Sequence, residues 1–159
     1  MPDEMKLIEN KTGETRIGFM VLFKFFQYEA RFPIHKFEVP KAVIEFIAKQ
    51  IFSEPKLYAQ YDWNGRSITY HRNQIREFFG FREDTLQDAQ DINDWLCKNI
   101  LHHDHEFEHL QEIVYQRFRE LKIVPPTPEQ IERLINSAVR IPRKSFFNPY
   151  FVSYLLLQF

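Results

Sequence analysis

The stretch from Glu14 to Phe32 constrains the fold of this chain more than any other part of the sequence. It is apolar on nearly every side, it contains no proline, and it is too long for a single β-strand. These properties predict a buried central helix that Pro33 closes. A pair of β-strands is the competing interpretation, because phenylalanine and valine also favour sheet.

Further helices are predicted from apolar residues at helical spacing, from proline in a first turn and from capping residues. The chain contains no internal repeat and no low-complexity segment, so we expect an all-α, multi-helix bundle. The predicted helices begin near Pro40, after Ser53 as the N-cap, after the turn Asp62 to Gly65 with Ser67 or Thr69 as the cap, after Asp84 or Thr85, and after the capping box Thr127 to Gln130. One more helix is predicted before this capping box, with Phe107, Leu110, Val114, Phe118 and Leu121 as its apolar stripe.

The composition fits one globular domain. A chain of 159 residues with 44% hydrophobic residues can bury roughly 70% of the surface that its unfolded form exposes. The single Cys97 cannot form a disulfide within the chain, and the acidic start lacks the pattern of a signal peptide, so we expect a cytoplasmic protein. The longest apolar stretch, Phe146 to Phe159, is shorter than the roughly 20 residues of a membrane span, and no membrane association is expected.

Positive charge is concentrated between Trp63 and Arg82. This stretch holds four arginines and one acid, in a chain whose formal net charge is −1. At about 100° per residue, the helix predicted here has an apolar face with a polar stripe beside it. Guanidinium, amide and hydroxyl groups such as those of the stripe bond phosphate oxygens and base edges, which predicts a DNA-binding surface. The apolar face consists of Ile68, His71, Ile75, Phe78 and Phe79, and the stripe of Thr69, Arg72, Asn73 and Arg76.

The short helix after Ser53, the turn and the basic helix resemble a helix-turn-helix unit, although the turn is a little long for the standard form. In such a unit the N-terminal half of the second helix reads bases in the major groove. An ordinary solvated helix face is the alternative. His71 lies on the apolar face, which favours a hydrogen-bonded, partly buried role over a base contact. The predicted reading residues are Thr69, Tyr70, Arg72, Asn73 and Arg76, and the predicted phosphate contacts are Arg66 and Arg82.

Charge is segregated in the second half of the chain. From Glu83 to Glu112 there are nine acids against Lys98 alone, whereas four bases and no acid occur between Arg133 and Lys144. These bases, and above all Arg140, Arg143 and Lys144, are a second candidate for phosphate contacts, with the solvated exit of the last helix as the alternative.

The histidines between His102 and His109 raise the question of a metal site. His105 and His109, four residues apart, would share a helix face and could chelate a divalent ion. No cysteine or second chelating pair supplies the remaining ligands, so no metal is expected. Cys97 is expected to be a buried and inert thiol. Because the sequence lacks a phosphate-cradling glycine loop, a zinc motif and a nucleophile constellation, neither a cofactor nor enzymatic activity is expected.

Several short blocks occur in order between about Arg16 and Arg140: Gly65-Arg66-Ser67, His71-Arg72, Ile75-Arg76, Gly80-Phe81-Arg82, Trp95-Leu96, Pro125-Pro126-Thr127, and Ile131 to Ala138. Together they resemble the N-terminal region of the large replicative transposases of the Tn-three family. In that family this region is a helical DNA-binding module that recognises the terminal inverted repeats of the transposon. The acidic catalytic triad lies several hundred residues downstream, so the resemblance implies DNA binding without catalysis.

The resemblance also implies a domain organisation and a partner. Residues 1–140 would form a helical DNA-binding domain, bound to the duplex DNA of a terminal inverted repeat and associated with the nucleoid. Residues 141–159 do not resemble the family, and we expect the start of a following element or a truncated or frame-altered end. Ile68 departs from the arginine that many members carry. The alternative function is a protein-interaction module that dimerises or regulates a full-length transposase through an aromatic surface that includes Phe146, Phe147, Tyr150 and Phe151.

Overall fold

The computed structural model describes residues 2–145, and the side chains of residues 3–140. Most of the backbone in this range is helical and almost none of it is sheet, so the prediction of an all-α, multi-helix bundle is confirmed. The chain divides into two compact units, Met1–Phe81 and Arg82–Phe159. Between residues 2 and 145, no helix is both long and apolar enough to cross a membrane.

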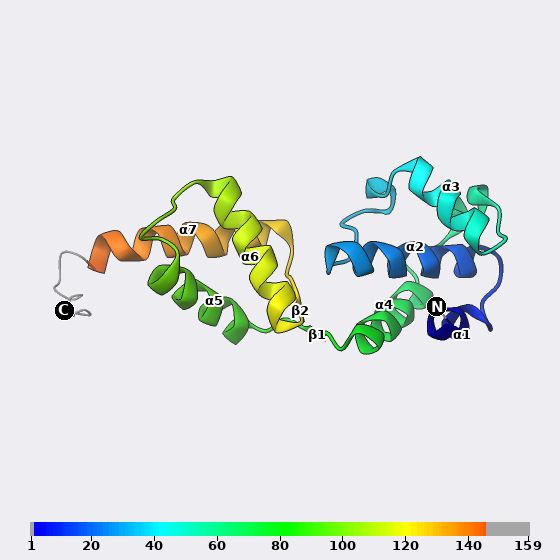
Figure 1. The fold of residues 1–159 in the computed structure, drawn as a ribbon, viewed down its shortest axis with the longest axis horizontal. Helices are drawn as coiled ribbons and strands as arrows, with labels where there is room; N and C mark the ends of the chain where they lie inside the picture. The colour runs from blue at the N-terminus through cyan, green and yellow to red at the C-terminus, as the bar shows by residue number, and fades with distance from the viewer. Residues whose placement is uncertain (1, 146–159) are drawn as a thin grey trace. The chain divides into compact units, whose positions relative to one another are not determined.

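The first unit is organised around a buried helix, α2 (Gly13–Glu29), as predicted, and the strand-pair interpretation is wrong. The predicted end at Pro33 is also wrong, because Ala30 adopts the left-handed conformation, with a φ of 56°, and ends the helix at Glu29. In Figure 1, α2 runs with α3 on one side and with α1 and α4 on the other, and it contacts all three. Helix α2 carries apolar residues on most of its sides, because neighbouring elements cover most of its circumference. The elements are α1 (Pro2–Ile8), α2 (Gly13–Glu29), the 3-10 helix η1 (Lys36–Glu38), α3 (Lys41–Gln50), the 3-10 helix η2 (Pro55–Gln60) and α4 (Arg66–Phe79).

Two residues of α2 hold the surrounding elements in place. The Arg16 guanidinium donates to the carbonyl oxygens of Ile8, at the end of α1, and Ile51, at the end of α3, over 3.2 to 3.4 Å. Gly18 leaves room for the ring of Tyr61, which would collide with any Cβ at this position. These contacts fix both the start of α2 and the segment that leads into α4.

The ends of α4 agree with the prediction at one side only. Gly80 ends the helix in the left-handed region, with a φ of 74°, as predicted. The N-cap is Gly65, so the predicted caps Ser67 and Thr69 are wrong. The helix begins earlier because the Asp62 carboxylate accepts a hydrogen bond from the backbone N–H of Asn64 over 3.0 Å. This bond closes the preceding turn just before Gly65.

The N-caps of three further helices agree with the prediction to different degrees. The short helix after Ser53 is a 3-10 helix with Glu54 as its N-cap, so the predicted cap Ser53 is wrong. Thr85 caps α5 in a capping box with Asp88, as one of the two predicted alternatives has it. The capping box that starts α7 (Pro128–Ser145) is confirmed. The backbone N–H of Gln130 donates to Thr127 Oγ1, and the backbone N–H of Thr127 donates to Gln130 Oε1.

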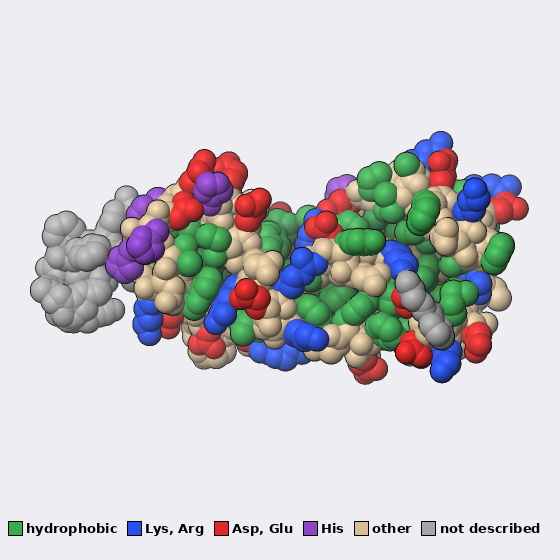
Figure 2. Space-filling view, viewed as in Figure 1, with side chains coloured by type: hydrophobic (Ala, Val, Ile, Leu, Met, Phe, Trp, Pro, Cys, Tyr) green, Lys and Arg blue, Asp and Glu red, His purple; other side chains and the backbone are tan. Residues whose placement is uncertain are grey.

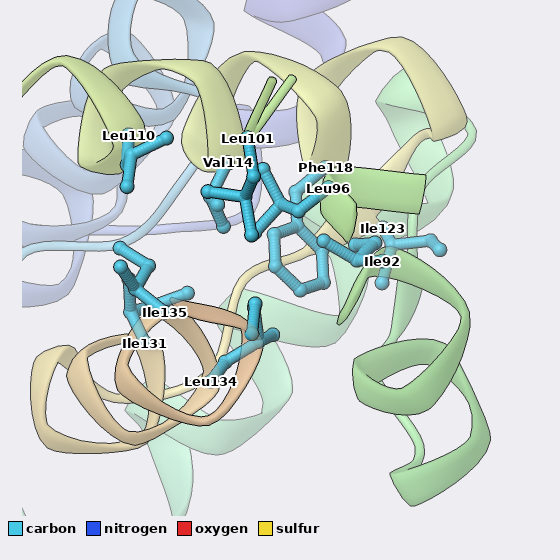
Figure 3. Packing of buried hydrophobic residues seen from close by; sticks show 11 residues of the cluster. Ile92, Leu96, Leu101, Leu110, Val114, Phe118, Ile123, Ile131, Leu134 and Ile135 are labelled. Carbon is cyan, nitrogen blue, oxygen red and sulfur yellow. The ribbon is translucent and has the colours of Figure 1, made fainter. Parts of the chain in front are cut away.

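The second unit packs three helices around one apolar core. Figure 3 shows side chains from α5, α6 and α7 converging on each other, with Phe118 and Ile123 among them. A two-residue parallel ladder, which the sequence did not predict, pairs Arg82 with Ile123 and Glu83 with Val124. The elements are β1 (Arg82–Glu83), α5 (Leu86–Asn99), α6 (Phe107–Leu121), β2 (Ile123–Val124) and α7 (Pro128–Ser145), which continues past the domain boundary expected at residue 140.

Candidate nucleic-acid interface

The exposed face of α4 gathers polar side chains along an open groove. Ile68 and Ile75 are buried on the opposite side of the helix, and Phe23 of α2 packs against Phe78 and Phe79. The docked apolar face therefore turns the polar face to solvent. The groove is lined by five of the predicted contact residues, together with Asn64 and Gly65 of the preceding turn: Arg66, Thr69, Tyr70, Asn73 and Arg76.

Two of these side chains are joined by a hydrogen bond. Arg76 Nη2 donates to Asn73 Oδ1 over 3.1 Å. One helical turn separates the two residues, so this bond aligns the guanidinium along the helix face. The pair presents a cation beside an amide, which is a combination that bonds phosphate oxygens and purine edges.

The N-terminus of α4 is occupied by an acid. The Asp62 carboxylate lies where a Cβ on Gly65 would be. A negative charge at this end stabilises the helix dipole, and it also opposes a phosphate there. The attraction for an anion on this face must therefore come from the arginine side chains.

Arg72 occupies a different environment from the rest of the predicted stripe. Its guanidinium carbon lies 5.7 Å from the centre of the Phe32 ring and 5.6 Å from the Trp63 ring, and its side chain is half-buried. Burial lowers its pKa below the usual value, although Tyr61 opposes this change. The DNA contact expected of Arg72 stays a prediction, and the residue does not line the groove.

His71 is buried, as the sequence predicted. The Tyr61 hydroxyl and His71 Nδ1 are 2.6 Å apart, and the two rings stack with centres 5.7 Å apart. Burial, with a smaller contribution from Lys11, lowers the pKa of His71 to about 4, so the imidazole is neutral near pH 7. Burial also raises the pKa of the Tyr61 hydroxyl, so this group stays protonated near pH 7 and shares a hydrogen bond with Nδ1.

Arg82 pairs with an acid of its own unit. Its two terminal nitrogens donate to the two oxygens of Asp88 over 2.7 and 2.8 Å. This bidentate contact raises the pKa of Arg82 and lowers that of Asp88. A phosphate contact by Arg82, which stays a prediction, would have to compete with Asp88.

The C-terminal bases belong to the second unit. Arg140 is exposed on α7, whereas Arg143 and Lys144 lie outside the residues whose side chains are described. The structure thus brings five predicted contact residues together on α4. Arg82 and Arg140 are carried by the other unit.

The region from His102 to His109 does not place His105 and His109 on one helix face, as their spacing of four residues would allow. Helix α6 begins at Phe107, so His105 lies before the helix and does not share a helical face with His109. His109 Nδ1 instead lies 3.2 Å from Asp104 and 3.3 Å from Glu106. Within the described range, no three histidine, cysteine or acidic residues are grouped closely enough to hold a metal ion.

Cys97 is half-buried, and its environment agrees with the expected inert thiol. Its Sγ lies 3.5 Å from the Ala138 carbonyl oxygen, and burial raises its pKa to about 11.

Sequence reasoning missed the turn residues at the groove. Asn64 and Gly65 line it beside Arg66, yet the sequence marked them only as a turn signal. Trp63, in the same turn, contacts Arg72. Their position directly before a basic helix was the available signal, because residues that precede a recognition helix reach the same surface.

Fold and surface together define a helical protein with one concentrated basic and polar face. The chain belongs to the family of the domain of unknown function DUF4158, whose model matches residues 1–138. It is also 27% identical over 140 residues to the transposase for transposon Tn1546 of Enterococcus faecium. This match covers 88% of the chain but 14% of that transposase. The chain is therefore related to a transposase and spans a small part of its relative's length.

Proposed function

We propose that this chain binds duplex DNA at the terminal inverted repeat of a transposon, as the N-terminal part of a transposase of the Tn-three type, without itself catalysing strand transfer. The observation that carries the proposal is the set of donors on the exposed face of α4. The relationship to a transposase supports it, because a transposase must locate the ends of its element.

In the proposed mechanism α4 enters the major groove with its polar face toward the bases. Asn73 offers an amide suited to adenine, and Arg76 a guanidinium suited to guanine or a phosphate. Arg66, at the start of the helix, would contact a phosphate. Tyr70, 61% exposed, offers a hydroxyl and an apolar ring for the sugar or the thymine methyl group.

Fluorescence anisotropy with a labelled duplex tests the proposal. The duplexes are the terminal repeat of the element that encodes this chain and a scrambled duplex of equal composition. Replacing both Arg66 and Arg76 with alanine should cost about 2–6 kcal/mol of binding free energy for the repeat, taking about 1–3 kcal/mol per contact.

A matched control removes the same charge from another helix of the same unit. Lys41 and Lys49 are exposed on α3, and the double Lys→Ala variant at these positions should bind the repeat within about threefold of the wild type, because screened charges outside the interface contribute little. Equal losses of DNA affinity in both double variants would show that only the total charge of the chain matters, and would reject the α4 face as the interface.

A protein-interaction function is the second candidate, and one observation favours it. The first unit exposes large aromatic side chains, and Figure 2 shows hydrophobic side chains at its surface. Tyr28, Phe37, Phe46 and Phe52 are each more than 60% exposed. An apolar interface hardly responds to salt, whereas DNA binding weakens steeply, so a salt titration of complex formation separates the two functions.

A further inference from the structure

Arg72 connects two segments that are distant in sequence. Its guanidinium lies within 6 Å of the ring centres of Phe32, which follows α2, and of Trp63, which belongs to the turn before α4. Phe32 is held in turn by Phe26 of the core, with ring centres 4.8 Å apart. Arg72 therefore joins a fixed point of the core to the turn.

The contacts of Arg72 are mainly with aromatic rings. Its Nε is buried and has no hydrogen-bond partner among the described residues. A guanidinium near aromatic faces gains cation–π attraction, which is stronger where water is excluded. The residue is thus placed by its packing, in contrast to Arg76, which donates to a side chain of the exposed face.

The turn that Arg72 contacts leads directly into the groove. Trp63 is followed by Asn64, Gly65 and Arg66, all three of which line it. Trp63 also packs edge-on against Tyr61, with ring centres 6.3 Å apart. A displacement of Trp63 would therefore move the start of the groove while leaving Asn73 and Arg76 in the middle of the helix.

We propose that Arg72 is a positioning residue, which holds the turn at Trp63 against α4 and so sets the place of Arg66 for DNA, and that it is not itself a phosphate or base contact. The inference rests on the proposed DNA-binding function. It divides the arginines of α4 into two kinds: Arg66 and Arg76 meet the DNA, and Arg72 orders the surface that presents them.

Replacing Arg72 with lysine separates positioning from contact. Lysine keeps the positive charge, so a phosphate contact would survive, but it lacks the planar group that packs on the rings. We expect Arg72→Lys to weaken binding of the repeat by about three- to tenfold at every salt concentration, with an unchanged slope of log K against log salt. Arg76→Gln, the matched comparison, should lower that slope by about one.

Trp63 fluorescence supplies a readout independent of DNA. In a Trp95→Phe background Trp63 is the chain's only tryptophan, and Arg72→Lys should shift its emission to the red and increase its quenching by acrylamide. Arg72→Gln should do the same and should also leave the salt slope unchanged. Thermal unfolding of each variant confirms that the chain is folded at the assay temperature.

Two results would overturn the inference. One is an Arg72→Lys variant with wild-type affinity and wild-type Trp63 emission. The other is an Arg72→Gln variant whose salt slope falls by about one, as expected for a lost phosphate contact. A wild-type chain that binds neither duplex would instead reject the proposed function, and the emission of Trp63 would still report whether Arg72 orders the turn.

Discussion

His71 and Tyr61 form a polar pair in the core of the first unit. The two side chains are hydrogen-bond partners of each other, because the protonated phenol lies 2.6 Å from Nδ1 of a neutral imidazole. The Phe19 ring packs edge-on against the imidazole, with ring centres 5.2 Å apart. Protonation of His71 would place a charge in this apolar environment near Lys11, so the pair ties the stability of the first unit to pH.

The free energy of unfolding of the first unit should therefore fall as the pH is lowered from about 6.5, the ordinary histidine pKa, to about 4. In this window the unfolded state binds a proton at His71 that the folded state does not bind. The loss should be on the order of 3 kcal/mol. Urea unfolding in the Trp95→Phe background, followed through Trp63 at several pH values, measures it.

Replacement of His71 by glutamine is the control for this titration. Glutamine does not titrate, so the variant should lose this component of the pH dependence, whatever its absolute stability. An equally steep fall between pH 6.5 and 4 in the glutamine variant would assign the effect to other groups.

Gly18 is a second position where a single residue limits the packing. A Cβ at this position would meet the ring of Tyr61. We expect Gly18→Ala to cost about 1–3 kcal/mol of unfolding free energy through overpacking. In a Tyr61→Ala background the ring is gone, and the same substitution should cost less than about 0.5 kcal/mol; additive costs would place the strain elsewhere.

Sequence reasoning succeeded for residues whose environment is set by their own helix. The position of His71 on the apolar face of α4 predicted its burial. The same helical spacing placed Arg72 in the polar stripe, but its surroundings depend on Phe32 and Trp63, which come from outside the helix. A helical wheel contains no information about such neighbours.

At the level of elements, the start of α5 combines three contacts. Asp88 accepts from the Thr85 amide over 2.7 Å, from the Thr85 hydroxyl over 3.0 Å, and from Arg82. The contact with Arg82 and those with Thr85 lower the pKa of Asp88. The Asp88 carboxylate thus completes the capping box of α5 and holds the side chain of Arg82, the residue that begins β1.

Asp88→Asn should destabilise the second unit, because the neutral amide weakens the capping box and the pair with Arg82. The capping contacts alone correspond to about 0.5–2 kcal/mol. The stability that the carboxylate supplies is present above about pH 4 and is lost as the pH falls below it, toward the lowered folded pKa. Urea unfolding in a Trp63→Phe background, followed through Trp95, should show this acid loss in the wild type and not in the variant.

Asp91 provides the matched control on the same helix. Asp91 is exposed, and its carboxylate accepts from the side-chain amide of Gln87 over 2.9 Å. Asp91→Asn should change the unfolding free energy by less than about 0.5 kcal/mol. A similar cost at both positions would contradict the role given to Asp88.

The sequence predicted helices where it has a long apolar stretch, apolar residues at helical spacing, or a capping box. Helices α2, α5, α6 and α7 all have one of these signals. The pairing of β1 with β2 gave none, because two residues per strand are too short for a periodic pattern and the partners are distant in sequence. The groove was half predictable: the sequence placed its arginines on one face, but not the turn residues beside them.

At the scale of the whole molecule, the formal net charge of −1 gives no general attraction to DNA. Under the proposed function, affinity must come from local surfaces on either unit. The α4 face supplies Arg66 and Arg76, and the second unit supplies the exposed Arg140 of α7. Each phosphate contact releases counterions, and the salt dependence of binding therefore counts the contacts of both units.

Arg140→Gln tests whether the second unit takes part. If Arg140 contacts a phosphate, the slope of log K against log salt should fall in magnitude by about 0.9, and the unfolding free energy should stay within about 0.5 kcal/mol of the wild type. Arg119→Gln, which removes an exposed base from α6 of the same unit, should leave the slope unchanged. Because both variants lower the net charge equally, a smaller slope in Arg140→Gln alone identifies a contact of that residue. Equal slopes in the wild type and both variants would show that Arg140 makes no phosphate contact.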